Sequence, residues 1–200
     1  METAATSSLG LIERIRQGDR DAFTPLFEKY RPRIAVLVHY KMSRQMRAQV
    51  EADDLLQETF LRAYRKFDQF SYRGPGSFMR WLARIAEHVI IDTARYQNRD
   101  RRRAEEQVPL RSESNPGGVE PVDSKTPSRL LARNERLQQL FRILDDLPEQ
   151  YREAILLAKI QGLTTQEIAE KLGKSRPAAA LLLHRALKHF RQMQQAKDSP

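Results

Sequence analysis

The stretch LTTQEIAEKLGKSRPAAALLLHRALKHFR, residues 163–191, contains the signals for two short helices and the turn that joins them. Thr164 and Glu167 have the spacing of a capping box, in which each side chain accepts a hydrogen bond from a backbone N–H at the helix start. Gly173 can adopt the left-handed conformation that ends a helix, Ser175 can cap the next helix, and Pro177 suits the first turn of that helix. These signals predict a helix-turn-helix, whose second helix commonly enters the DNA major groove. An ordinary helical hairpin has similar signals.

The second helix, expected over about 176–191, has an outer face with few hydrogen-bond donors. Counting back from Lys188 in steps of three or four residues gives Leu181 and Pro177 on that face. Direct readout of bases usually needs Arg, Lys, Asn or Gln. Leu181 could contact a thymine methyl group or pack inside the module, and the sequence leaves both open.

Residues 104–128 differ in composition from the chain on either side. They contain four of the ten prolines, the pair Gly117-Gly118 and almost no large apolar residues. Such a composition is typical of a flexible linker, although a surface loop of a single domain is the alternative. We therefore expect an N-terminal module over 9–103 and a C-terminal module over 129–195.

The surplus of positive charge is divided between the two modules. The chain carries a net charge of +9, with 20 basic and 12 acidic residues in 9–103 and two basic and five acidic residues in the linker. Lysine and arginine near phosphates release condensed counterions, so a polyanionic partner is expected. Two basic modules on a tether suit a protein that touches an extended polyanion at two places.

Composition also excludes several classes of protein. The chain has no cysteine, which rules out disulfides and thiolate metal sites. Its apolar runs are far shorter than the roughly 20 residues that cross a bilayer, so we expect a cytoplasmic protein without membrane insertion.

The N-terminal module is expected to be helical. Phe23, Leu26 and Tyr30 recur at helical spacing before Pro32, where we expect the helix to be interrupted. A second stripe consists of Leu56, Phe60, Tyr64 and Phe67, and it follows Asp53 and Asp54, which suit a helix start by capping and by the helix dipole.

After this helix, Gly74-Pro75-Gly76 predicts a turn, and another helical pattern begins at Phe78. Alternating strand patterns with flanking turn signals are missing from the sequence. The predicted fold class is all-α, with two small helical domains, a flexible linker and a helix-turn-helix in the C-terminal domain.

Four segments resemble a known family. Residues 53–64 (DDLLQETFLRAY), 70–74 (FSYRG) and 78–86 (FMRWLARIA) resemble the second conserved region of bacterial RNA polymerase sigma factors of the extracytoplasmic-function (ECF) group, and 144–149 (LDDLPE) resembles the start of their fourth region. With the helix-turn-helix, the resemblance covers nearly the whole chain. It implies a dissociable subunit of core RNA polymerase that binds promoter DNA and directs its melting and transcription initiation.

The resemblance also implies roles for individual residues of the N-terminal module. The expected partners in core polymerase are its largest and second-largest subunits. The positions that would face the largest subunit are Asp53, Asp54, Gln57, Glu58 and Arg62. A solvated helix face stabilised by charge spacing is the alternative for them. The positions that would bind and open the minus-ten element are Tyr72, Arg73, Phe78, Arg80, Trp81, Arg84, His88, Asp92, Arg95, Arg99, Arg101 and Arg102.

One departure from the family pattern and one alternative affect these expectations. His88 stands where related proteins often have asparagine, which leaves the preferred base open, and Trp81, the only tryptophan, could be a core residue instead of a base platform. Strand opening needs stacking partners and positive charge, which a turn beside a basic helix can supply.

In the C-terminal module the resemblance implies a surface for the minus-thirty-five element. Its members would be Thr165, Ser175, Arg176, His184, Arg185 and Lys188. The recognition helix departs from the family at 179–182, where Ala-Ala-Leu-Leu replaces a polar segment, so upstream readout is expected to be weaker or of another kind.

Other classes of function fit less well. The sequence offers no phosphate-binding glycine loop and no histidine spacing for a metal, so we expect no enzyme, cofactor or metal. A recombinase could use Asp53, Asp54 and Glu58, but nothing downstream completes a metal site. A helix-turn-helix repressor that acts without polymerase remains the main alternative, and binding of an anti-sigma factor is left open.

Overall fold

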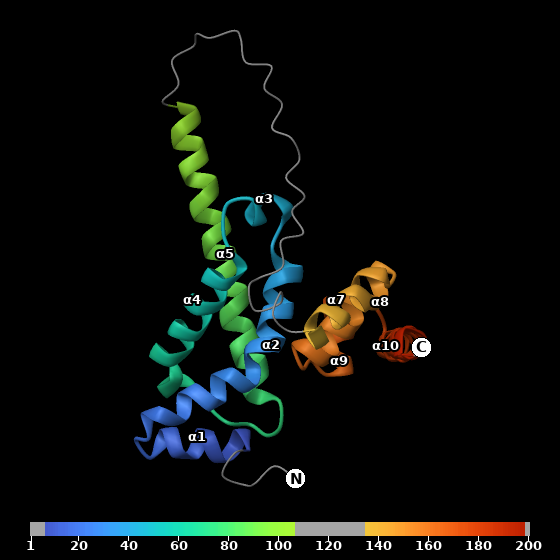
Figure 1. Cartoon of the computed structure of the whole chain (residues 1–200), viewed down its shortest axis with the longest axis horizontal. Coiled ribbons are helices and arrows are strands. Elements are labelled where there is room, and N and C mark those ends of the chain that lie inside the picture. Colours follow the sequence, from blue (N-terminus) through green and yellow to red (C-terminus); the bar gives the residue numbers. More distant parts are fainter. Residues whose placement is uncertain (1–6, 107–134, 199–200) are drawn as a thin grey trace.

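The computed structural model describes residues 7–106 and 135–198, with side chains for 7–99 and for 135–196 apart from residue 136. The N-terminal module consists of α1 (Ser8–Arg16), η2 (Arg20–Ala22), α2 (Phe23–Lys41), α3 (Arg44–Arg47), α4 (Ala52–Arg65), η3 (Phe67–Gln69) and α5 (Ser77–Glu106). The C-terminal module consists of α7 (Glu135–Asp146), α8 (Glu149–Ile155), the π-helical turn η4 (Leu156–Ile160), α9 (Thr165–Lys171) and α10 (Arg176–Asp198). Within these ranges the chain forms only helices and their connections, which confirms the predicted all-α class (Figure 1).

The core of the N-terminal module forms where α2, α4 and α5 pack against one another. Phe67, Phe70 and Phe78 are buried and meet in tilted or edge-to-face contacts, with 5.3 Å between the ring centroids of Phe70 and Phe78. Aromatic pairs in this geometry add about 0.5–1.5 kcal/mol beyond the burial of their area. The cluster fixes the start of α5 against the turn that precedes it.

Helix α2 continues through Pro32, so the predicted interruption at this residue is wrong. Proline removes one backbone donor and costs about 3 kcal/mol in a helix interior. The cost is offset because Ile34, Leu37 and Val38 are buried to at least 99% and each stabilises the fold by about 1.5–3 kcal/mol. In Figure 1 the ribbon of α2 changes direction along its length, as expected for a helix that contains proline.

The helix-turn-helix forms with the local bonds that its sequence predicts. Thr164 Oγ1 accepts from the Glu167 backbone N–H at 3.3 Å, and Glu167 Oε2 accepts from the Thr164 backbone N–H at 2.7 Å. Gly173 has a φ of +62°, and Ser175 Oγ accepts from the Ala178 N–H at 3.3 Å, which caps α10. The capping box, the glycine turn and the second cap are thus confirmed.

The two modules pack against each other in the structure. Arg33 Nη2 of α2 donates to the Lys159 carbonyl oxygen at 2.7 Å, and Tyr40 Oη donates to Asp145 Oδ1 at 2.8 Å. The Phe141 ring stacks on Tyr40 with 5.5 Å between centroids and meets His39 edge-on at 4.7 Å. Buried side chains of both modules form one continuous apolar cluster.

Two helix ends differ from the expected boundaries. Helix α5 extends to Glu106, three residues into the segment predicted as a linker, and α10 extends to Asp198 instead of ending near Arg191. Residues 107–134 lie outside the described part, so the rest of the predicted linker stays a prediction. Of the helices that are described, none combines the length and apolar character of a membrane span.

Candidate polymerase and nucleic-acid interfaces

Helix α4 carries the residues predicted to face the polymerase. Asp53 and Asp54 lie in its first turn, where negative charge is favourable beside the helix dipole, but the N-cap residue is Glu51 and no side chain caps the helix. The predicted capping by the two aspartates is therefore wrong. Asp54 and Gln57 are exposed, while Asp53 and Glu58 are half-buried.

Arg62 forms two ion pairs, one within α4 and one that links α4 to α5. Its Nε donates to Glu58 Oε1 and its Nη1 donates to Asp92 Oδ2, both at 2.6 Å. The hydrogen bond to Asp92 raises the pKa of Arg62, the one to Glu58 raises it further, and the guanidinium in turn lowers the pKa of Asp92. Residues predicted for two separate surfaces thus form a single bridge between the helices.

The exposed side of α4 also has an apolar part that the sequence analysis missed. Leu61 and Tyr64 are each 41% exposed, although Tyr64 was expected to face inward. The Tyr64 ring still packs on Phe23, with 4.6 Å between centroids, so it lies at the margin of the core. Leu61 falls outside the apolar stripe of α4. That departure from the helical period could have indicated an exposed apolar residue.

Phe78 and Trp81, both predicted to contact the minus-ten element, are covered to different degrees. Phe78 is only 2% exposed and packs against Tyr30, Phe70 and Trp81, so its predicted contact with DNA does not fit this structure. Trp81 is half-buried and lies 5.1 Å from the Phe70 ring, which favours a role in the wall of the core. Part of Trp81 still borders a cavity described below.

The turn before α5 is held by its own residues. Gly74 and Gly76 have φ values of +98° and +80°, a region that side chains disfavour. Ser77 Oγ donates to the Gly74 carbonyl oxygen at 2.7 Å and accepts from the Arg73 N–H at 3.3 Å. Arg73 is exposed and Tyr72 half-buried, so the turn presents its arginine to solvent.

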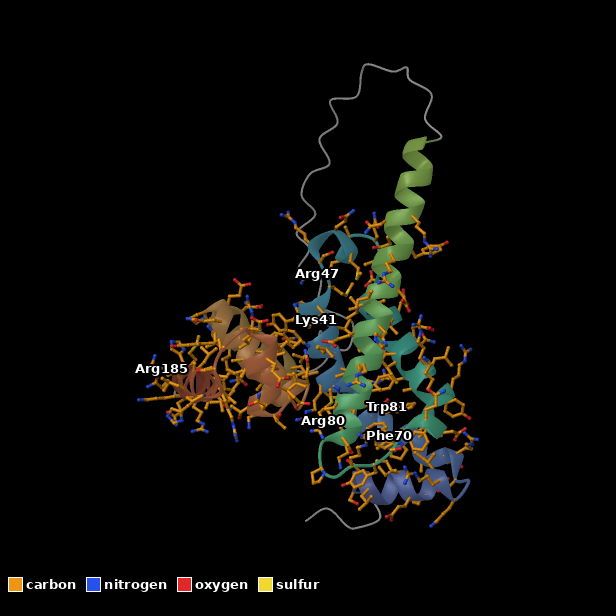
Figure 2. The ribbon with its side chains drawn as sticks, turned by 180° about the vertical axis from the view of Figure 1, so that it is seen from behind. Lys41, Arg47, Phe70, Arg80, Trp81 and Arg185 are labelled. Atoms are coloured by element: carbon orange, nitrogen blue, oxygen red, sulfur yellow. The ribbon has the colours of Figure 1, made fainter. Side chains whose placement is uncertain are left out.

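A cavity of about 470 Å³ lies beside this turn and is bordered by both modules. Its basic lining comes from Arg73, Arg80 and Arg84, and the C-terminal module contributes Glu167. Arg80 Nη1 donates to the Gly162 carbonyl oxygen at 3.1 Å. Figure 2 shows Phe70, Arg80 and Trp81 together near the start of α5. The start of the predicted minus-ten surface therefore contacts the C-terminal module in this arrangement.

Glu167 is held in its charged form at this cavity. The Thr164 backbone N–H lowers the pKa of Glu167 most, the Thr164 hydroxyl lowers it further, and the nearby Arg80 and Arg84 contribute smaller effects. One carboxylate thus serves the capping box and faces the basic side of α5.

The outer part of α5 carries a second group of exposed charges. His88, Arg95 and Arg99 are exposed, and the Arg99 guanidinium lies 5.9 Å from the centre of the Tyr96 ring. Tyr96 itself is 60% exposed, an aromatic surface that the sequence analysis did not select. Arg101 and Arg102 lie on the last turns of α5, where the side chains are outside the described part.

The predicted minus-thirty-five surface lies on the helix-turn-helix. Arg176, His184, Arg185 and Lys188 are all exposed on α10, Thr165 is half-buried at the start of α9, and Ser175 caps α10. In Figure 2 Arg185 lies on the side of the C-terminal module that faces away from the N-terminal helices. Leu181 is 50% exposed, which decides against packing inside the module.

In the described ranges, no group of three or more His, Cys, Asp or Glu side chains lies close enough together to hold a metal ion. Within the described part, the acidic residues considered for a recombinase are thus not gathered into such a group. The chemistry presented by both modules is cationic and aromatic, and it suits binding of a polyanion.

A basic helical module joined to a helix-turn-helix module is the architecture of a DNA-binding transcription protein. The family model described as ECF sigma factor matches residues 6–196, nearly the whole chain. The chain belongs to the ECF sigma factor family, and its function is that of an RNA polymerase sigma factor in transcription initiation.

Known relatives agree with this assignment. An ECF RNA polymerase sigma-E factor of Haemophilus influenzae is 32% identical over 160 residues, which make up 80% of each chain. One of Escherichia coli K12 is 34% identical over 159 residues, 80% of this chain and 79% of that protein.

Solved structures of lower similarity include CnrH in complex with the cytosolic domain of CnrY, at 22% identity and a TM-score of 0.46, with 97% of this chain and 99% of that chain covered. The sigma factor RpoE of Bartonella quintana, in complex with the anti-sigma factor NepR, is 18% identical with a TM-score of 0.41, and 86% and 96% of the two chains are covered.

Proposed function

We propose that this sigma factor uses three surfaces: the exposed side of α4 for core polymerase, the turn and basic side of α5 for the minus-ten element, and α9–α10 for the minus-thirty-five element. The chain acts as a regulatory subunit in the cytoplasm, where it lends promoter specificity to the polymerase and is not itself an enzyme. The observation that carries the proposal is the family match over residues 6–196, which includes all three surfaces.

The surface on α4 combines charge with an apolar centre. Asp54 and Gln57 are exposed on the same helix as Leu61 and Tyr64, each of which is 41% exposed. Protein interfaces commonly have an apolar or aromatic centre with a polar rim. The Arg62 bridge to Glu58 and Asp92 fixes α4 relative to α5. Polymerase binding to α4 therefore sets the position of the helix that meets DNA.

The surface around α5 has what strand opening requires. Positive charge follows the helix at Arg80, Arg84, Arg95 and Arg99, and the half-buried Trp81 and exposed Tyr96 are aromatic. Single strands bind to such surfaces through phosphate contacts and stacking of bases on aromatic rings. The buried Phe78 supports Trp81 from behind, so it acts as a positioning residue.

Engaging two promoter elements requires the modules to separate. In the packed arrangement Arg80 is bonded to Gly162, and Glu167 borders the same cavity, so a DNA strand would have to displace both. The described contacts between the modules include hydrogen bonds and ring contacts, each worth about 0.5–1.5 kcal/mol, and part of the shared apolar cluster. Opening therefore needs the free energy of binding to both polymerase and DNA.

The α4 surface is tested by measuring the affinity of the chain for core polymerase. Asp54→Lys with Gln57→Lys changes two exposed positions and spares the Arg62 bridge, and we expect at least a tenfold loss of affinity with unchanged helicity. The matched control, Glu13→Lys with Gln17→Lys, changes the net charge equally on exposed positions of the α1 segment. Equal affinity of both variants would contradict the assignment of α4.

A further inference from the structure

The outer face of the first half of α10 is apolar although it is exposed to solvent. Leu181 is 50% exposed, and Pro177, Ala178 and Ala180 are also exposed. The opposite face contains the fully buried Ala179 and Ala186, while Leu182 and Leu183 pack against the core. The apolar clusters of the module thus form without Leu181, half of whose surface faces solvent.

Basic side chains lie before and after this apolar face along the helix. Arg176 precedes it at the start of the helix, and His184, Arg185 and Lys188 follow it. Single exposed leucines are common on proteins, but this one lies on the second helix of a helix-turn-helix, between basic residues at both ends. A partner that matches it must be anionic at the rim and apolar at the centre.

The major groove of DNA has this distribution of chemistry. Phosphates line its edges, and the C5-methyl group of thymine is the apolar group that base pairs present on its floor. Ala178 and Ala180 have side chains too short to hydrogen-bond to bases, and they leave room for the helix to approach the floor of the groove. Leu181 is the only large apolar side chain on this face.

We propose that Leu181 selects thymine in the upstream promoter element by contact with its methyl group, while Arg185 and Lys188, further along the helix, bind phosphates. The inference rests on the proposed role of α9–α10 and adds the base class that is read. Selection by apolar contact gives the exposed face from Pro177 to Leu181, which lacks Arg, Asn and Gln, a way to discriminate sequences.

The test uses the full chain bound to core polymerase and a promoter duplex obtained by mapping transcript starts. Each thymine of the upstream element is replaced in turn by deoxyuracil, which lacks only the methyl group. Loss of one buried methyl contact should weaken binding about fourfold at one or two positions. With Leu181→Ala the thymine and deoxyuracil duplexes should bind equally at those positions.

Two further variants control for folding and for charge. Leu9→Ala removes another leucine that is 39% exposed, on α1, and should keep the full thymine preference. Arg185→Ala should weaken binding of both duplexes by the same factor. Equal binding of thymine and deoxyuracil duplexes by the unchanged chain would overturn the inference, as would a preference that persists in Leu181→Ala. If no holoenzyme forms, or if it starts no promoter-dependent transcripts, the proposed function fails instead.

Discussion

The two helices proposed to meet DNA, α5 and α10, differ in how they present their side chains. Helix α5 begins at an aromatic cluster and carries arginines along its length, so its surface combines stacking groups with charge. Helix α10 begins with an apolar outer face and places its charges at the margins. The difference matches two tasks, because separating strands needs stacking and charge, whereas reading a closed duplex needs a shape that fits the groove.

The largest effect is expected for Phe78, which supports the α5 surface from inside. Phe78→Ala should lower the free energy of unfolding by about 3–5 kcal/mol, because it leaves a cavity within the aromatic cluster. Leu181→Ala on α10 should change it by less than about 0.5 kcal/mol. Chemical denaturation of both variants measures the contrast, and similar losses would contradict the assignment of Phe78 to the core and Leu181 to the surface.

The next largest effect is a change in the distance between the modules when the chain binds core polymerase. The chain has no cysteine, so Arg65→Cys on α4 and Gln192→Cys on α10 provide two labelling sites for a distance measurement. We expect the distance on core polymerase to be longer than in the free chain. Arg33→Ala with Tyr40→Phe removes two hydrogen bonds across the contact and should lengthen the distance in the free chain. An equal distance with and without polymerase would show that the modules do not separate.

A smaller effect is expected from single phosphate contacts on α10. Arg185→Ala should weaken binding to all duplexes in similar proportion and reduce the slope of log affinity against log salt by about 1. Titrations of duplex at several salt concentrations measure this slope. A slope that stays the same would mean that the exposed guanidinium of Arg185 does not meet phosphate.

The smallest effect is a pH dependence of the contact between the modules. Burial lowers the pKa of His39 below its ordinary value of 6.5, Arg47 lowers it further, and Asp145 partly opposes the shift. Opening would relieve part of the burial, which is the largest cause, and raise the pKa of His39 towards its ordinary value, so the open state takes up the proton first as the pH falls. The contact is therefore fully stable above the ordinary pKa and weakens as the pH falls from about 7 towards 5.

The labelled chain measures this dependence, and His39→Phe keeps an aromatic ring at the position but cannot titrate. That variant should lose the change in distance between about pH 7 and pH 5. A wild-type distance that does not respond to pH in this range would rule out His39 as the titrating group.

Local features were predictable because their causes lie within a few residues. The capping box of Thr164 and Glu167, the turn at Gly173 and the cap at Ser175 all follow from backbone groups that need partners at helix ends. The failure at Pro32 has a different origin. Its local cost is outweighed by the burial of Ile34, Leu37 and Val38, which depends on helices far along the chain.

The site was less predictable because several of its contacts join distant residues. Arg62 meets Asp92 at a separation of 30 residues, and Arg80 meets Gly162 at a separation of 82. No local spacing encodes such pairs. The inward position of Phe78 was ambiguous for another reason, since an aromatic residue beside a turn suits both a core and a base contact.

The central claim is that both modules select the promoter as part of one polymerase complex, and sequencing of transcript starts tests it most directly. The chain is added to core polymerase on a library of genomic fragments, and the transcripts are mapped. We expect starts preceded by a shared minus-ten and a shared minus-thirty-five element, with Arg185→Ala impairing use of the latter. Random starts, or starts that do not depend on the added chain, would contradict the account.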